Sequence, residues 1–267
     1  MPSFVTPKMI QNYEQDGVVL IKGLFMNHIE VLRRGIDRNM QAPGPFGAEN
    51  LKEGEAGRFF DDYCNWDRID EFREVIHTSD AALVAAQLMQ SKTVQLFHDH
   101  VLVKEPGTSK STPWHSDSPY YFIKGHQNVS FWVPLDPVRE ASLRLVAGSH
   151  KWPKQVLPTR WLSEESFYPN PEDYMAVPDP DQEGMRVLEF KMEPGDAVAF
   201  HYRCLHGARG NHSASRRRAF SLRLLGDDAR FTERPGRTSP PFEGHGMQEG
   251  DLLRNDWFPI LLDNAAN

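Results

Sequence analysis

Cysteine is scarce in this sequence. Its 267 residues include two cysteines, Cys64 and Cys204, which are too few for a disulfide framework. A reducing, cytoplasmic setting is therefore the default expectation. No apolar run approaches the ~20 residues that a membrane helix needs, and the N-terminus lacks a basic region followed by an apolar stretch. We therefore expect neither a membrane partner nor a signal peptide.

Positive charge is also in short supply, because 30 Lys and Arg face 37 Asp and Glu, for a formal net charge of -7. Nucleic-acid binding favours a clustered basic face, so we expect no nucleic-acid partner. We find neither an internal repeat nor a low-complexity tract. The length allows one large domain or two small ones. The sequence carries no signal of the oligomeric state.

Helices are predicted mainly in the first third of the chain. Thr6 is a good N-cap, and Pro7 suits the first position of the helix that follows. Residues 41–57 are rich in Gly, Pro and Glu, so we predict a loop there. The predicted elements are helices over 6–15, from 27 to about 36 and over about 68–89 with a break near Ser79, and a buried strand over 18–25.

The pattern changes after residue 92 to short apolar runs that turn residues separate, such as Glu105-Pro106-Gly107. Many short strands with such turns are typical of a β-sandwich or barrel. Residues 152–185 are rich in Pro, Asp and Glu and are predicted to be a long insertion, which in many proteins acts as a lid. Strands are predicted over 94–104, 128–135, 142–148, 186–192, 196–202 and 218–226.

His115 and Asp117 form an H-x-D pair on a segment that we predict to be extended. Side chains alternate along a strand, so both point to the same face. A third ligand can come from His206, which directly follows a predicted strand. Two histidines and one carboxylate leave open positions on the metal, as in non-haem Fe(II) oxygenases. An H-x-D pair is common in proteins that bind no metal, so a purely structural role stays open on this pattern alone.

Arg217 lies eleven positions after His206, at the start of a predicted strand. An oxo-acid that chelates iron at one end needs a cation for its far carboxylate, and a guanidinium binds a carboxylate through two parallel hydrogen bonds. The alternative is that Arg216, Arg217 and Arg218 form a solvated basic turn, which is the better interpretation for two of the three.

Together these motifs resemble the phytanoyl-CoA dioxygenase (PhyH) family of 2-oxoglutarate-dependent oxygenases, over nearly the whole chain and most weakly at 41–92 and 152–185. The resemblance implies a mainly β fold with flanking helices and a double-stranded β-helix (jelly-roll, cupin-like) core. It implies one oxygenase domain over 1–267, with a supporting region at 1–92, the core at 93–230 and a tail at 231–267. The matching segments are KEPGTSKSTPWHSDSPYY (104–121), VSFWVPLDPV (129–138), SLRLVAGSHK (142–151), EPGDAVAFHYRCLHGARGN (193–211) and RRAFSLRLLGDD (217–228).

Residue by residue, the resemblance places His115, Asp117 and His206 as the iron ligands and Arg217 at the distal carboxylate of 2-oxoglutarate. Trp132 matches a position that lines the co-substrate pocket, with core packing as the alternative.

Other positions near the co-substrate are matched less directly. His100 falls where a co-substrate contact is expected, although a hydrogen-bonded barrel histidine is the alternative, and His98 shares its strand face. Asn211 is more simply a turn-capping amide. Two departures are Ala141-Ser142, where the family often has Gly-Cys or Gly-Gly, and Ala208, which replaces a frequent serine.

The implied cofactors are Fe(II), 2-oxoglutarate and O2, and the implied reaction hydroxylates a small organic molecule with release of succinate and CO2. Asp117 favours hydroxylation or a related oxidation, because halogenating relatives lack this carboxylate. Two rival classes remain: a cupin-like metalloenzyme such as an isomerase, which needs no Arg217, and a non-catalytic small-molecule-binding barrel.

Substrate contacts are the least determined part of the site. Tyr120, Tyr121 and Phe60 are candidate pocket walls, and ordinary core packing is the alternative for each. Further candidate aromatic walls are Phe59, Trp161, Phe167 and Tyr168. Lys104, Arg144 and Arg223 could meet an acidic substrate group, with structural ion pairs as the alternative.

Overall fold

A large β-sheet forms the centre of the computed structural model, which describes residues 4–139, 142–161, 163 and 165–264. Its strand order is β1-β10-β7-β12-β4-β3-β2, and β14 also pairs with β4. Every pairing in it is antiparallel. The strands are β1 (Val18–Ile21), β2 (Ala48–Glu49), β3 (Phe59–Tyr63), β4 (Thr93–Lys104), β7 (Asn128–Pro134), β10 (Ala197–Phe200), β12 (Arg217–Leu225) and β14 (Ile260–Asp263).

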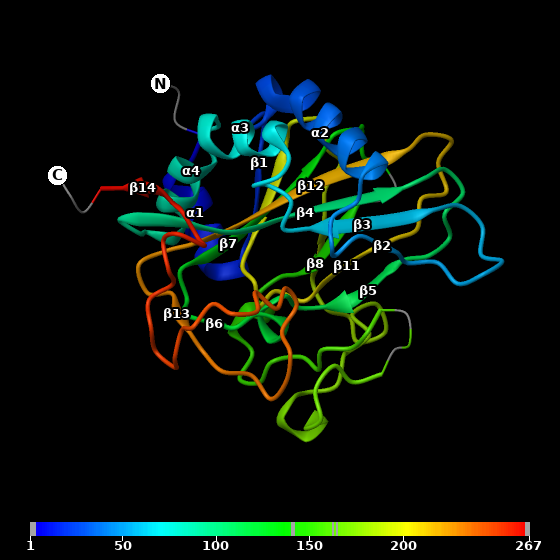
Figure 1. Ribbon diagram of the computed structural model, residues 1–267. Coiled ribbons are helices and arrows are strands. Elements are labelled where there is room, and N and C mark those ends of the chain that lie inside the picture. The colour runs from blue at the N-terminus through cyan, green and yellow to red at the C-terminus, as the bar shows by residue number, and fades with distance from the viewer. Residues whose placement is uncertain (1–3, 140–141, 162, 164, 265–267) are drawn as a thin grey trace.

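A smaller sheet with the order β5-β11-β8-β9 lies below the large one (Figure 1). The two sheets make the jelly-roll core that the sequence predicts, and the fold class is thereby confirmed. Its strands are β5 (Thr112–His115), β8 (Leu143–Val146), β9 (Val187–Glu189) and β11 (His206–Ala208), and a separate two-stranded ribbon consists of β6 (Ile123–Lys124) and β13 (Arg230–Phe231).

The helices cover the outer face of the large sheet, opposite the small sheet (Figure 1). Thr6 caps the first of them, because its hydroxyl accepts a hydrogen bond from the Met9 amide at 3.3 Å. Gly17 ends it in the left-handed conformation, with φ 73°. The helices are α1 (Pro7–Asp16), α2 (Ile29–Gln41), α3 (Asp70–Thr78) and α4 (Ala81–Met89), with single 3-10 turns at Met26–His28, Ser118–Tyr120, Ser149–Lys151 and Pro171–Asp173.

Alternation along β12 separates the core from the cavity. Phe220 and Leu222 point toward the helices and are fully buried, and the Phe220 ring lies 4.9 Å from that of Phe72 in α3. Arg217, Ser221 and Arg223 point the other way and line a cavity between the sheets. One strand therefore serves both the hydrophobic core and the polar interior.

Several element predictions need correction. The strand predicted over 18–25 ends at Ile21, and β2 lies within the predicted loop over 41–57. His206 begins a strand of its own rather than following one. Strands β3 and β14 were not predicted, because FFDDY shows no alternation and β14 is short and half-exposed. The predicted helix break near Ser79 is confirmed.

The large sheet draws strands from far apart in the sequence. β1, β2 and β3 come from the first 92 residues and β14 from the C-terminal tail, so all regions of the predicted domain contribute to one sheet. Ser142 is buried, and its neighbour Ala141 lies outside the described residues. Within the described ranges, no helix combines the length and apolar composition that a membrane crossing requires.

Candidate metal and co-substrate site

The two candidate histidine ligands lie side by side on the small sheet. His115 is the last residue of β5, His206 is the first of β11, and the two are direct antiparallel partners. Their ring centroids are 4.2 Å apart. Asp117 follows two residues after His115, and all three side chains are buried. Residues 91 positions apart in the sequence are thus brought to one point by strand pairing.

A backbone carbonyl orients each imidazole. Nδ1 of His115 lies 2.8 Å from the Pro113 carbonyl oxygen, and Nδ1 of His206 lies 2.9 Å from that of Cys204. Because a carbonyl only accepts, Nδ1 carries the proton in both rings, and the lone pair of Nε2 is free for a metal. Hydrogen bonds of this kind fix the tautomer and ring orientation of metal-binding histidines.

The Asp117 carboxylate lies at distances from the two histidines that fit a first-row metal ion, and the ligand atoms of all three residues lie within 4.8 Å of one another. Oδ1 of Asp117 lies 3.7 Å from Nε2 of His115 and 3.8 Å from Nε2 of His206. Two atoms that are each about 2 Å from a common ion are at most about 4 Å apart, so these spacings suit a shared metal. Within the described residues, this is the one group of three or more His, Cys, Asp or Glu side chains with convergent ligand atoms.

Electrostatics keep these groups in the form that binds a metal. Burial lowers the pKa of His115 to about 3, with His206 adding to the effect, so the ring is neutral. Burial also lowers the pKa of His206. For Asp117, burial raises the pKa, but Arg223 and the two histidines outweigh it and bring the pKa to about 2. Two neutral imidazoles and an ionised carboxylate are the donor set of the non-haem iron triad.

Arg217 lies on β12 with its guanidinium inside the cavity, 5.6 Å from the centre of the Trp132 ring. Burial lowers its pKa to about 10, so it stays charged at neutral pH. Trp132 lines the same cavity from β7. The predicted co-substrate pair therefore lies together, in one cavity with the three metal-ligand candidates.

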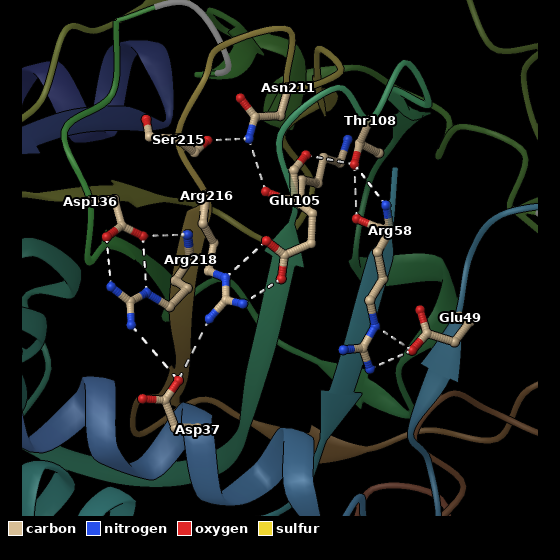
Figure 2. Close-up of polar contacts among 11 residues, drawn as sticks. Asp37, Glu49, Arg58, Glu105, Thr108, Asp136, Asn211, Ser215, Arg216 and Arg218 are labelled. Atoms are coloured by element: carbon tan, nitrogen blue, oxygen red, sulfur yellow. Dashed lines mark hydrogen bonds and ion pairs between the residues drawn. The ribbon is translucent and has the colours of Figure 1, made fainter. Parts of the chain in front are cut away.

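The neighbours of Arg217 point to the other side of the sheet (Figure 2). Arg216 donates from Nε to Glu105 at 3.0 Å, and Arg218 contacts Asp136 through Nε at 3.0 Å and Nη2 at 2.8 Å. Arg216 lies in the turn before β12, whereas Arg218 lies within the strand, and both are held by ion pairs with acidic side chains. The interpretation as a solvated basic turn is therefore wrong for Arg218.

Asn211 caps the turn before β12, as predicted (Figure 2). Its Nδ2 donates to the Lys104 carbonyl at 2.9 Å and to the Ser215 carbonyl at 2.8 Å. This amide therefore joins the turn to the end of β4, and it holds the turn from which Arg217 enters the cavity.

His98 and His100 both point into the cavity from β4, as their shared strand face predicts. Nε2 of His100 lies 2.8 Å from Oδ2 of Asp61, whose other oxygen accepts from Asn50. His100 is thus a hydrogen-bonded barrel histidine that also faces the cavity. Asp61 and Asn50 were not expected at the site. The sequence predicted a loop over 41–57 and a helix over about 68–89, with no strand where β3 lies.

The cavity has a volume of about 500 Å³, and aromatic rings from the insertion form part of its wall. The Trp161 ring lies 5.1 Å from that of His115, and Phe167 lies 5.0 Å from Tyr120. Tyr120 and Tyr121 line the cavity as predicted. The Tyr120 hydroxyl donates to the Thr159 carbonyl at 2.7 Å, which ties the insertion to the site.

Phe60 was expected at the cavity wall, and this expectation is wrong. Its ring is buried in the hydrophobic core beneath the helices. Alternation along β3 instead turns Asp61 and Tyr63 toward the cavity.

The three cations considered for an acidic substrate differ in their surroundings. Arg144 is held by Asp181 and Glu189, which is the structural ion-pair alternative. The Lys104 ammonium donates to the Lys110 and Arg209 carbonyls. Burial and the nearby Arg217 lower the pKa of Lys104 to about 6. Arg223 alone of the three lines the cavity.

A jelly roll with a buried two-histidine, one-carboxylate set and an arginine in the same cavity defines a class of mononuclear non-haem metal enzymes. The sequence profile of the family described as phytanoyl-CoA dioxygenase (PhyH) matches residues 13–219. The chain belongs to this family, as its motifs predict.

Named relatives agree with this assignment. The chain is 24% identical over 274 residues to "Dioxygenase cdmD" of Talaromyces verruculosus, covering 91% of this chain and 78% of that protein. It is 26% identical over 174 residues to a "Probable phytanoyl-CoA dioxygenase" of Caenorhabditis elegans, and this match spans 62% of the chain and about half (51%) of that protein.

Among solved structures, the epimerase SnoN in complex with Fe3+, alpha-ketoglutarate and nogalamycin RO has the same fold. The TM-score is 0.74 at 21% identity, over 95% of this chain and 97% of that one.

Proposed function

We propose that this protein is an Fe(II)- and 2-oxoglutarate-dependent dioxygenase that hydroxylates a small organic molecule and releases succinate and CO2. The observation that carries the proposal is that four side chains face one cavity: His115 and His206 from the small sheet, Asp117 from the turn after β5, and Arg217 from the large sheet. Family membership supports it, and so does the presence of Fe3+ and alpha-ketoglutarate in the similarly folded SnoN.

In this proposal Nε2 of His115, Nε2 of His206 and the Asp117 carboxylate hold Fe(II), which supplies the oxidising chemistry together with O2 and 2-oxoglutarate. Arg217 binds the distal carboxylate of 2-oxoglutarate, and Trp132 packs beside that guanidinium. Trp161 and the insertion limit the access of water above His115.

The outcome of the oxidation has a second candidate, because SnoN is an epimerase. Epimerisation would invert a centre and leave the mass unchanged, and it would consume two electrons from an external reductant because the substrate itself is not oxidised. Hydroxylation adds one oxygen atom and needs no such reductant. The retained Asp117 carboxylate supports hydroxylation over halogenation. Mass spectrometry of the product distinguishes hydroxylation from epimerisation.

The test is anaerobic reconstitution with Fe(II) followed by titration with 2-oxoglutarate. We expect the visible charge-transfer absorption of an Fe(II)–2-oxoglutarate complex, and succinate formation once O2 is admitted. Absence of 2-oxoglutarate binding to the Fe(II) protein would contradict the proposal and favour a cupin-like metalloenzyme. A His206→Ala variant that keeps the activity of the protein would favour a non-catalytic barrel.

A further inference from the structure

Arg223 is a second buried arginine in the cavity, and the three nitrogens of its guanidinium differ in their contacts. Its side chain is 6% exposed. Nε donates to the Tyr121 hydroxyl at 2.7 Å, and Nη2 lies 3.4 Å from Oδ2 of Asp117. Nη1 is buried and has no hydrogen-bond partner within the described part of the chain. A buried guanidinium donor without an acceptor costs free energy, and a bound acceptor would remove that cost.

His98 lies directly across from Arg223, because the two residues are partners in the pairing of β4 with β12. Its Nδ1 lies 3.0 Å from the Asp99 carbonyl oxygen, so Nδ1 carries the proton. Burial, with Arg223 adding to it, holds the pKa of His98 well below its usual value, so the ring is neutral. Nε2 is then an acceptor, and it too is buried without a partner among the described residues.

Arg217 and Arg223 are the two buried arginines of the described cavity lining, because Arg160, which also lines the cavity, is exposed. A buried guanidinium with an unsatisfied donor matches a carboxylate oxygen, because the opposite charges strengthen the hydrogen bond.

Arg217 and Arg223 cannot serve as one subsite. They are six residues apart on β12, which corresponds to about 20 Å along an extended strand. Arg217 is the partner proposed for the distal carboxylate of 2-oxoglutarate. Arg223 instead touches the candidate metal ligand Asp117, so it lies next to the place where substrate is oxidised.

We propose that Arg223 and His98 form a second subsite, which binds a carboxylate of the primary substrate through Arg223 and a neighbouring hydroxyl through His98. The substrate class is thus a small hydroxy acid. The inference rests on the proposed oxygenase function and adds the chemistry of the substrate to it. The same carboxylate chemistry has a second possible source, the 2-oxo acid end of 2-oxoglutarate, and the experiment separates the two.

The experiment uses the full-length protein loaded anaerobically with Fe(II) and 2-oxoglutarate, and three probes: phenylacetate, phenylacetamide and mandelate. Binding is followed through the change that each probe makes in the charge-transfer absorption and by calorimetry. We expect phenylacetate to bind on the order of tenfold more tightly than phenylacetamide, because only the acid matches the guanidinium. Mandelate, which adds a hydroxyl, should bind more tightly than phenylacetate.

Variants assign these preferences to residues. Arg223→Gln should abolish the preference for the acid over the amide while 2-oxoglutarate affinity stays within about threefold, a change of under 1 kcal/mol. Arg223→Lys keeps the charge and should retain part of the preference, and the Fe(II) content of both variants is measured to verify that the site still loads. His98→Gln should remove the gain of mandelate over phenylacetate. Arg216→Gln is the matched control, since that arginine lies outside the cavity.

Three results would overturn the inference. One is that the wild-type protein binds the acids no better than the amide, or binds none of the probes. Another is that Arg223→Gln keeps the preference. The third is that Arg223→Gln loses 2-oxoglutarate affinity, which would assign the subsite to the co-substrate. Failure of the oxygenase proposal itself would be seen separately, as no 2-oxoglutarate binding in the wild-type protein.

Discussion

The two sheets around the cavity position their functional side chains in different ways. On the small sheet, His115 and His206 lie on strands of four and three residues, and each ring is oriented by the carbonyl two residues before it. On the large sheet, Arg217 and Arg223 lie on a nine-residue strand that pairs with β4 on one side and β7 on the other.

The orientation of the histidines thus depends on short local segments, whereas the orientation of the arginines depends on the large sheet as a whole. The histidine rings need their own short segments and one strand pairing. The arginines need the register of three long strands and the helices packed behind them, because a shift by one residue would turn Arg217 and Arg223 out of the cavity. Substitutions of the histidines on the small sheet should therefore abolish metal binding and the activity that depends on it. Substitutions on the large sheet should instead lower the free energy of unfolding or the affinity for 2-oxoglutarate.

The largest effect is expected from His206→Ala on the small sheet. Because loss of outer hydrogen-bond partners alone costs about 10–100-fold, loss of a ligand should leave below about 1% of succinate formation. Iron content after reconstitution and the rate of 2-oxoglutarate turnover are the measurements. His212→Ala, which changes an exposed histidine, is the control, and equal loss in both variants would argue against a metal role for His206.

Phe220→Ala tests the large sheet from its helix-covered face. The ring is fully buried against Phe72, and its removal should lower the free energy of unfolding by about 3–5 kcal/mol. Denaturant unfolding of the metal-free protein measures this. Leu252→Ala, at a side chain that is 66% exposed, should change stability by less than about 0.5 kcal/mol. Similar losses in both variants would show that the sheet is not supported by this packing.

Arg217→Gln tests the cavity face of the same strand. Removal of a buried guanidinium from a bound carboxylate costs about 2–5 kcal/mol, so the KM for 2-oxoglutarate should rise on the order of 30-fold or more. Arg216→Gln, one residue earlier and held by Glu105 on the outer side, should leave KM unchanged. If the two variants behave alike, the orientation of β12 does not decide co-substrate binding.

The smallest effect is expected from Ala208→Ser on β11, which lines the cavity. The added hydroxyl restores the residue that is frequent in the family and can donate one hydrogen bond to the co-substrate, worth about 0.5–1.5 kcal/mol. The KM for 2-oxoglutarate should fall by no more than about tenfold, as steady-state kinetics would show. A large loss of activity would mean that the hydroxyl clashes with the occupied site.

Local signals were enough to predict some elements and residues of this protein. Thr6 and Pro7 predicted the start of α1. The H-x-D pair predicted that His115 and Asp117 lie together, although Asp117 lies just beyond β5 with a helical backbone conformation and not on the same strand face. β3 was not predicted, because FFDDY places polar residues on both faces of the strand. Phe60 was misplaced for the same reason, since without β3 there was no alternation to show that it points into the core.

The sequence by itself determined the family, the jelly-roll class, the three metal-ligand candidates and the arginine eleven positions beyond the last of them. The family and the fold class follow from the resemblance of the motifs, and the ligand candidates and the arginine follow from their places within those motifs. Only the tertiary structure decided that Arg217 faces the cavity while Arg216 and Arg218 pair with acids outside it, and that Arg223 stands opposite His98 beside Asp117. The physical reason is that strand pairing joins residues more than a hundred positions apart, and the register of that pairing determines which face of each strand meets the cavity.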